Sequence, residues 1–284
     1  MRARVVSTAG LRASGAPWLV HLDGVDVVVK CPSAEGSSPG EVRTEAVALG
    51  VAERCGVLAP RVVSADLTGD EAGTVAVVMT VLAGDAQIAL RPDVRKLRLL
   101  GAEAAAIHQH ALSPQPDLPR RDRPIPWIDF LAERAAGTQP TTDVLASGDA
   151  ALASYDRPPP ASVFVHGDLW QGNVMWDGER YAGTIDWEGA GAGDPGVDLG
   201  SLRFDATLTF GFDAARHVLA GWEDRAGRAA PDVAYWDLVA GLNTPADMSP
   251  FQRTMGEAGR TDLTGALLDE RRDDFVRAAL RELS

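Results

Sequence analysis

The chain has 284 residues, more than one small core needs, so we expect two lobes or one large domain. Its 40 acidic and 27 basic residues give a formal net charge of -13, which repels nucleic-acid phosphates and excludes a DNA- or RNA-binding role. No stretch approaches the ~18 consecutive apolar residues of a membrane span. The two cysteines, Cys31 and Cys55, lie in no CxxC or Cys/His pattern, so neither a disulfide framework nor a structural zinc site is expected.

The first residues give no targeting signal. Basic residues at positions 2 and 4 are followed by a segment that polar residues and glycine interrupt, so no apolar signal core forms. We therefore expect a cytoplasmic protein without nucleic-acid or membrane partners, as a monomer or homodimer.

Strand-like runs dominate the first 82 residues. A turn signal, Asp23-Gly24, joins the first two runs and predicts a β-hairpin that ends at Lys30. The runs span residues 17–22, 25–30, 60–65 and 73–82.

One helix interrupts these strands. Over residues 40–54 the apolar positions recur at helical spacing, and Glu45 lies on the same face. A carboxylate on an apolar face needs a partner, for which Lys30 on a neighbouring strand is suitable. The alternative is a position at the edge of the face, with the carboxylate in water.

The pattern changes to helix after the break at 83–85. Residues 1–82 therefore predict an N-terminal lobe with an antiparallel sheet and one main helix, and residues 83–284 predict a larger, mostly helical lobe. Helices are expected over 92–111, within 127–155, and as four or five further helices after 194.

The segment 163–176 places polar side chains between two apolar runs. Its loop contains His166, Asp168 and Asn173, and the next apolar run ends at Asp186. Carboxylate and carboxamide oxygens together suit Mg²⁺, which keeps water and substrate phosphates as its other ligands. Each of these residues alone is also typical of an ordinary turn. The complete spacing favours a functional site.

The distance between Asn173 and Asp186 depends on the register of the hairpin that joins them. A four-residue loop at 177–180 pairs Asn173 with Thr184, which leaves Asp186 about 7 Å further along the strand. A two-residue Asp-Gly turn would double that separation. We therefore expect the four-residue loop, a common hairpin length.

The pattern His166-x-Asp168 with Asn173 five residues on, followed by Ile-Asp-Trp-Glu at 185–188, resembles the aminoglycoside phosphotransferase and choline kinase superfamily. The resemblance covers nearly the whole chain. It implies an α/β (α+β) fold with two lobes, similar to protein kinases, in which the N-terminal lobe binds nucleotide. It also implies an O-phosphotransferase that uses Mg²⁺ and ATP, or GTP.

The resemblance implies a role for each matching residue. Asp168 orients the substrate hydroxyl and accepts its proton, while Asn173 and Asp186 hold Mg²⁺ on the nucleotide phosphates. His166 is expected to hydrogen-bond to the backbone. Asp198 accepts backbone N–H bonds from the catalytic loop or, alternatively, caps the following helix. The expected nucleotide-binding residues are Lys30, Glu45, Ser14, Gly15 and the interlobe segment Met79, Thr80, Val81 and Leu82.

The acceptor is less well defined, because the catalytic pattern handles the phosphate. Carboxylates and aromatic rings in the helical lobe favour a cationic molecule such as an aminoglycoside or amino sugar, and Trp170, Glu188 and Asp194 are candidate contacts. Choline-, homoserine- and fructosamine-like substrates are alternatives, so antibiotic resistance and metabolism are not separated. A non-catalytic nucleotide-binding protein is disfavoured, since Lys30 and Asp168 are both retained.

Overall fold

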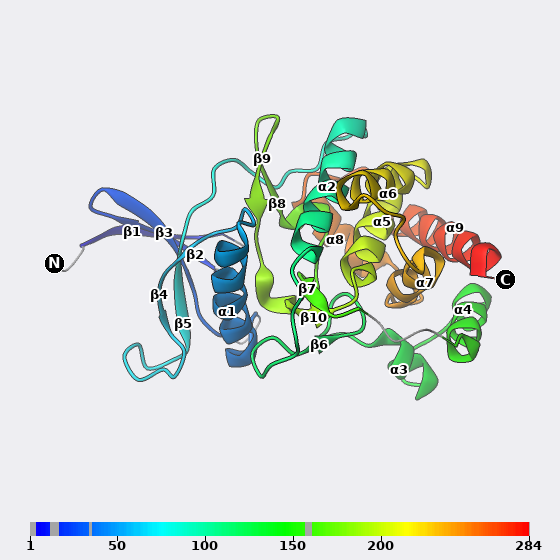
Figure 1. Ribbon diagram of the computed structural model, residues 1–284, viewed down its shortest axis with the longest axis horizontal. Coiled ribbons are helices and arrows are strands. Elements are labelled where there is room, and N and C mark those ends of the chain that lie inside the picture. Colours follow the sequence, from blue (N-terminus) through cyan, green and yellow to red (C-terminus); the bar gives the residue numbers. More distant parts are fainter. Residues whose placement is uncertain (1–3, 12–16, 34–35, 157–160, 284) are drawn as a thin grey trace.

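The computed structural model describes residues 4–11, 17–33, 36–156 and 161–283. A sheet-rich part and a mostly helical part lie side by side, with helix α1 between the sheet and the remaining elements (Figure 1). The expected α/β class, with an antiparallel sheet next to helices, is confirmed. The proposed boundary after residue 82 falls between the last strand of this sheet and the next helix, and it stays a prediction.

The sheet is antiparallel throughout, in the order β1-β2-β3-β5-β4. The predicted hairpin is β2 and β3, and it turns at Gly24, whose φ of 89° favours glycine. Lys30 ends β3, the central strand, and pairs with Val77 of β5. The strands are β1 (Val5–Gly10), β2 (Trp18–Leu22), β3 (Val25–Lys30), β4 (Val62–Asp66) and β5 (Ala76–Thr80).

Helix α1 (Pro39–Cys55) matches the helix predicted at 40–54. It begins at a capping box, in which Ser38 and Glu41 satisfy each other's backbone N–H groups, and it ends at Gly56 in the left-handed conformation. Its buried face packs on the sheet and on residues of the catalytic segment, including Trp187. This shared core fixes the sheet relative to the catalytic segment.

The helical part contains α2 to α9. The helix predicted within 127–155 is two helices, because Gly137 takes φ +71° and Thr142 caps a new start. No helix of the described residues is long and apolar enough to cross a membrane. The helices are α2 (Val94–His108), α3 (Phe130–Ala135), α4 (Asp143–Ser154), α5 (Gly196–Phe210), α6 (Asp213–Ala226), α7 (Val233–Leu242), α8 (Ser249–Glu257) and α9 (Gly265–Leu283).

Helix α5 is the centre of the helical part, since α6, α7 and α9 all pack against it. Every residue of α5 except Phe210 is buried. Polar groups on this helix therefore need internal partners, and two of them, Asp198 and Asp205, find these partners in the catalytic loop.

Short strands frame the catalytic loop. A small sheet has the order β6-β10-β7, and β8 pairs with β9 in the hairpin that leads to Asp186. Single 3₁₀ turns, η1 and η2, lie at 171–173 and 187–189. The strands are β6 (Arg120–Arg121), β7 (Val163–Val165), β8 (Val174–Asp177), β9 (Arg180–Thr184) and β10 (Gly191–Gly193).

The register predicted for this hairpin is present next to the turn, where Trp176 pairs with Tyr181, but it is wrong by one residue further along the strands. Asp177 pairs with Arg180 across a two-residue turn, and Val174, instead of Asn173, pairs with Thr184. The cause is a bulge that leaves Ala182 unpaired, since Met175 pairs with residue 183 and Trp176 with residue 181. The extra residue places Ile185, instead of Thr184, opposite Asn173, so Asp186 lies one residue closer to Asn173 than predicted.

Candidate active site

The loop between β7 and β8 is hydrogen-bonded to Asp198 of α5. The backbone N–H groups of His166 and Gly167 donate to the two oxygens of Asp198, at 2.7 and 2.8 Å. His108 Nε2 donates to the same carboxylate at 3.0 Å, and Trp222 Nε1 donates to His108 Nδ1. We call Asp198 and these partners the Asp198 support. The predicted N–H bonds to Asp198 are present, and α5 begins two residues earlier, at Gly196.

Asp198 is fully buried but stays charged. Burial acts to raise its pKa, but the hydrogen bond from His108, together with the N–H donors, outweighs burial and lowers the pKa below its usual range. The carboxylate therefore contributes to stability as an ion with satisfied oxygens.

His166 is a buried, neutral side chain of this loop. Its Nε2 donates to the carbonyl of Ile185 at 2.9 Å, and its Nδ1 accepts from the N–H of Asp168 at 3.3 Å. Burial lowers its pKa, which favours the neutral ring that this pair of bonds requires. The expected backbone bond is present, and it ties the loop to the strand that leads to Asp186.

Asp168 and Asn173 face each other across the loop. The Asn173 carboxamide donates to the backbone carbonyl of Asp168 at 2.9 Å and to Oδ2 of its carboxylate at 3.1 Å. The carbonyl of Asn173 accepts from the N–H of Ile185 at 2.9 Å, one residue before Asp186. Asp186 is in the left-handed conformation, with φ 67°. The three polar residues of the sequence pattern thus meet at one end of the hairpin.

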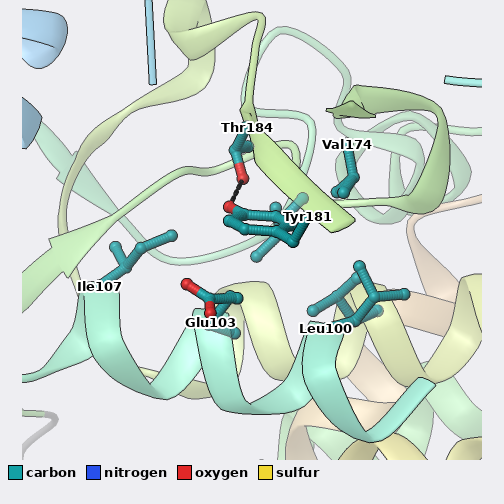
Figure 2. Close-up of a pocket in the computed structure, with 9 residues that line it drawn as sticks. Leu100, Glu103, Ile107, Val174, Tyr181 and Thr184 are labelled. Carbon is teal, nitrogen blue, oxygen red and sulfur yellow. Dashed lines mark hydrogen bonds between the residues drawn. The ribbon is translucent and has the colours of Figure 1, made fainter. Parts of the chain in front are cut away.

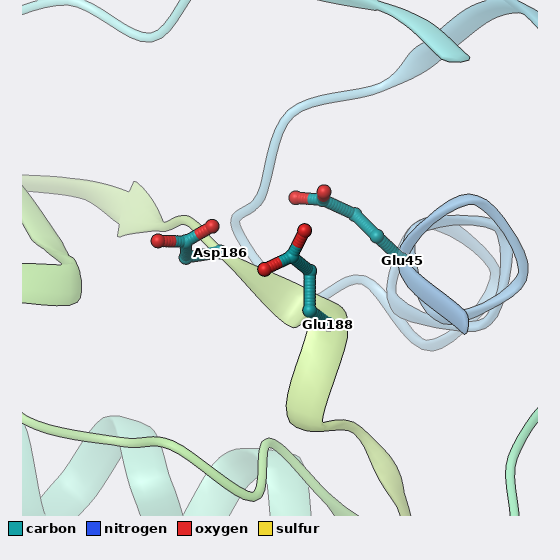
Figure 3. Close-up of side chains that lie close together, drawn as sticks. All are labelled: Glu45, Asp186 and Glu188. Atoms are coloured by element: carbon teal, nitrogen blue, oxygen red, sulfur yellow. The ribbon is translucent and has the colours of Figure 1, made fainter. Parts of the chain in front are cut away.

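Lys30 lies among three carboxylates, two of which come from the segment after β9. Its Nζ is 2.8 Å from Glu45 Oε2, 2.5 Å from Asp186 Oδ1 and 3.0 Å from Glu188 Oε1. The three carboxylates point toward one another (Figure 3). We call these four residues the Lys30 cluster. The expected pairing of Glu45 with Lys30 is confirmed, and the alternative of Glu45 at a solvated edge is excluded by its exposure of 2%.

The Lys30 cluster sets one ammonium against three carboxylates. Burial acts to lower the pKa of Lys30, but the three carboxylates together raise it, so that the ammonium persists. Burial also raises the pKa of Glu45 despite the nearby ammonium. The carboxylate oxygens of Glu45, Asp186 and Glu188 lie within 4.8 Å of one another, and oxygen donors of this kind suit a hard cation such as Mg²⁺.

Glu188, which was predicted to contact the acceptor, forms an ion pair with Lys30. It was expected at the acceptor, but the structure places it on Lys30, because the turn η2 directs it back toward α1. Its position two residues after Asp186 was a usable signal, since a tight turn brings such neighbours to one side.

The other predicted acceptor contacts are packed into the protein. Asp194 is 4% exposed and accepts from the N–H of Gly196 at the start of α5. Trp170 is half-buried against the cluster of Phe204 and Leu208. Their roles toward an acceptor stay predictions.

The interlobe residues form the end of β5 and the segment that follows. Met79 is buried in the core shared with α1, whereas Val81 is 44% exposed. Thr80 accepts a hydrogen bond from the N–H of Arg61. Ser14 and Gly15 lie outside the described residues, so that part of the nucleotide-binding prediction stays untested.

A small cavity lies behind the catalytic loop, and Leu169, Val174 and residues of α2 line it. Figure 2 shows Val174 on the side of the cavity opposite α2. Glu103 points into it from α2, opposite the hydroxyl of Tyr181, which bonds to Thr184 at 2.6 Å. Its volume of about 10 Å³ is that of roughly one water molecule. The cavity is too small for a substrate.

Comparison with known proteins points to one family. The sequence model of the phosphotransferase enzyme family matches residues 8–237. The chain is 40% identical to viomycin phosphotransferase of Streptomyces vinaceus over 80 residues, 26% of each chain. It is 29% identical to homoserine kinase of Methylorubrum populi over 197 residues, 62% of this chain and 57% of that one. The alignments thus span less than two thirds of either relative.

The fold is also shared with solved structures. A thermostable mutant of an aminoglycoside phosphotransferase, in a ternary complex with AMP-PNP and hygromycin B, superposes with a TM-score of 0.62. It covers 96% of this chain and 94% of its own, at 18% sequence identity. At this identity the likeness establishes the common fold.

Proposed function

Because the chain belongs to the phosphotransferase enzyme family, we propose that it is a small-molecule kinase that transfers the γ-phosphoryl group of ATP to a hydroxyl of a cationic acceptor. The family resemblance expected from the sequence is thereby confirmed. An ATP analogue in the structural neighbour supports ATP as co-substrate, with GTP as the alternative nucleotide.

One observation carries the proposal. Lys30 and Asp186, 156 residues apart, meet in one buried cluster, and the strand before Asp186 is bonded to Asn173 beside Asp168. The group that we propose contacts phosphate and the carboxylate that we propose accepts a proton thus lie on neighbouring segments. This is the arrangement that transfer of a phosphoryl group to a hydroxyl requires.

Each residue would have a distinct part in the transfer. Asp168 accepts a hydrogen bond from the acceptor hydroxyl and then its proton, as the new oxygen–phosphorus bond forms and the bond to ADP breaks. Lys30 neutralises charge on the nucleotide phosphates, and Glu45 holds its ammonium in place. Asn173 and Asp186 would hold Mg²⁺, which supplies charge neutralisation on the phosphates.

A cationic acceptor is supported by the acidic composition, 40 acidic against 27 basic residues, and by the neighbour that binds hygromycin B. Viomycin phosphotransferase among the relatives supports the same class. Homoserine is the second candidate, because the homoserine kinase alignment covers 62% of this chain.

Phosphate transfer from γ-labelled ATP, with Mg²⁺, tests the proposal directly. The acceptor panel comprises viomycin, hygromycin B, an amino sugar, homoserine and choline, and Asp168→Asn is the matched control. We expect labelled product from at least one cationic acceptor, and an approximately tenfold higher KM when its amine is acetylated, because charge-assisted hydrogen bonds are lost. Affinity should fall as salt rises.

Two results would contradict the proposal. Labelled product from homoserine alone would contradict the proposed acceptor class but would still support the kinase activity. No Mg²⁺-dependent binding or hydrolysis of either nucleotide would remove the kinase assignment as well.

A further inference from the structure

Gln171, within the catalytic loop, is bound twice by a carboxylate of α5. The backbone N–H of Gln171 donates to Asp205 Oδ2 at 3.2 Å, and its side-chain Nε2 donates to the same oxygen at 2.7 Å. Nε2 also lies 3.4 Å from the hydroxyl of Thr209, one turn further along α5. One side chain of the central helix therefore holds both the backbone and the side chain of a loop residue.

Burial of the Asp205 carboxylate at this position is energetically unfavourable. It is 5% exposed, on a helix that is buried almost throughout, and its Oδ1 is buried and accepts no hydrogen bond from the described residues. A buried carboxylate with one unsatisfied oxygen indicates a function for the oxygen that is satisfied.

The charged groups around Asp205 are few. Arg260, between α8 and α9, favours the charged form of Asp205. Its Nε and one terminal nitrogen, however, donate to the two carboxylate oxygens of Asp262. From α9, Arg271 donates to the carbonyl of Leu208 on α5. Burial outweighs the bonds from Gln171 and Thr209 and the charge of Arg260, and raises the pKa of Asp205 to about 6.

The segment that Asp205 holds links the two polar residues of the loop. Residues 171–173 form the single turn η1, whose N–H at Asn173 returns to the carbonyl of Trp170. Asn173 in turn donates to the carboxylate of Asp168. A Cβ on Gly172 would lie 2.1 Å from the ring of Trp170, so the turn has little room to shift. Displacement of Gln171 would therefore move Asn173 relative to Asp168.

We propose that Asp205 is a positioning residue for phosphoryl transfer, which in its charged form fixes the turn 171–173 and so sets the placement of Asn173 against Asp168. The proposal rests on the proposed function for its kinetic consequence, but its structural part concerns the loop alone. Asp205 differs from Asp198, because Asp198 holds the residues before Asp168 and has both oxygens satisfied. The loop is thus held by Asp198 at all pH values near neutral, and by Asp205 with a strength that depends on pH.

The kinetic test compares pH profiles of kcat between pH 5 and 8. In the parent enzyme kcat should fall as pH drops through about 6, because protonation removes the negative charge that strengthens both hydrogen bonds from Gln171 to Oδ2 of Asp205. Asp205→Asn should lower kcat at pH 7.5 by about tenfold to a hundredfold, as for displaced catalytic groups, and its profile should lack the step near pH 6. The KM for nucleotide should change little.

Gln171→Met gives a second, independent variant. It keeps the length of the side chain and removes the Nε2 donor, so the charged form of Asp205 is less favoured. The step should therefore move to higher pH. The control is Asp237→Asn, which removes a buried carboxylate of α7 that pairs with Arg203 of α5 and has no hydrogen bond to the loop. It should lower Tm and leave the step in place.

Hydrogen exchange of the peptide that contains residues 169–174 provides a readout without activity. After correction for intrinsic rates, protection in the parent should fall below pH 6, and this fall should be absent in Asp205→Asn. A variant with the parent's kcat profile and exchange profile, changed only in Tm, would overturn the proposal. If Asp205→Asn does not fold, an unmoved step in Gln171→Met overturns it. If the parent transfers no phosphate, the exchange data still decide this inference while the proposed function fails.

Discussion

The two sides of the catalytic loop differ in how their charges are balanced. In the Asp198 support one buried carboxylate accepts two backbone N–H bonds and a bond from a histidine, so that both of its oxygens are hydrogen-bonded. In the Lys30 cluster one ammonium faces three carboxylates of the described residues. Both sites are buried and both contain carboxylates, but in one the carboxylate meets N–H donors and in the other the carboxylates share one ammonium.

This difference separates framework from reactive site. A satisfied buried ion adds stability and has nothing left to bind. A buried cluster whose carboxylates share one ammonium costs stability in the free protein and is retained where it binds a charged partner. Substitutions should therefore affect stability on the Asp198 side and activity on the side of Lys30 and Asp168.

The largest effect is expected at Asp168. Asp168→Asn removes the proton acceptor and should lower turnover by ~10²–10⁴, about 3–5 kcal/mol, with nucleotide affinity and Tm nearly unchanged. Steady-state kinetics and thermal unfolding of the same preparation measure both quantities. Turnover within a factor of two of the parent would show that Asp168 is not the base.

Asp198→Asn should have the opposite profile. The substituted amide cannot accept from both backbone N–H groups and His108, so we expect the free energy of unfolding to fall by about 3 kcal/mol. Denaturant unfolding measures this change, and Asp177→Asn, at an exposed pair with Arg180, is the control with an expected effect below about 1 kcal/mol. A loss for Asp198→Asn no larger than that of the control would contradict the support role.

The pH dependence of stability sharpens this prediction. The pKa of Asp198 is lower in the folded state than in the unfolded state, so the carboxylate stabilises the fold above the unfolded pKa of about 3.9. The advantage of the parent over Asp198→Asn should be constant near neutral pH and shrink as pH falls below about 4. Unfolding curves of the two proteins from pH 3 to 7 test this, and a gap that widens toward low pH would reverse the assigned sign.

A smaller effect is expected from coupling between Lys30 and Glu45. Lys30→Met and Glu45→Gln should each weaken nucleotide binding, and the double variant should cost less than their sum by about 1–2 kcal/mol. Calorimetric titrations of the four proteins complete the cycle. Simple additivity would mean that the 2.8 Å ion pair has no role in nucleotide binding.

Much of this site could be predicted from local sequence. A lysine at the end of a hairpin and a carboxylate on an apolar helix face suggested the pair that the structure contains. The bonds from the loop to Asp198 were one of two roles considered for this residue, and the family resemblance implied them. Such inferences succeed where a buried polar side chain has few possible hydrogen-bond or ion-pair partners.

The errors arose where tertiary packing decides. The bulge at Ala182 has no local signal beyond Gly183, which takes φ +144° and whose Cβ would lie 2.8 Å from the carbonyl of Leu58. Glu188 turns toward Lys30 because of η2, and Asp205 meets Gln171 only because α5 lies under the loop. These contacts depend on distant elements, which sequence spacing does not show.

Calorimetric titration of Mg-ATP into the parent and into Asp186→Asn tests the central claim most directly, that the Lys30 cluster binds the metal–nucleotide complex. We predict that the parent binds Mg-ATP more tightly than ATP in chelator, and that Asp186→Asn loses this difference while Tm stays close to the parent value. The same dependence on Mg²⁺ in both proteins would contradict the account.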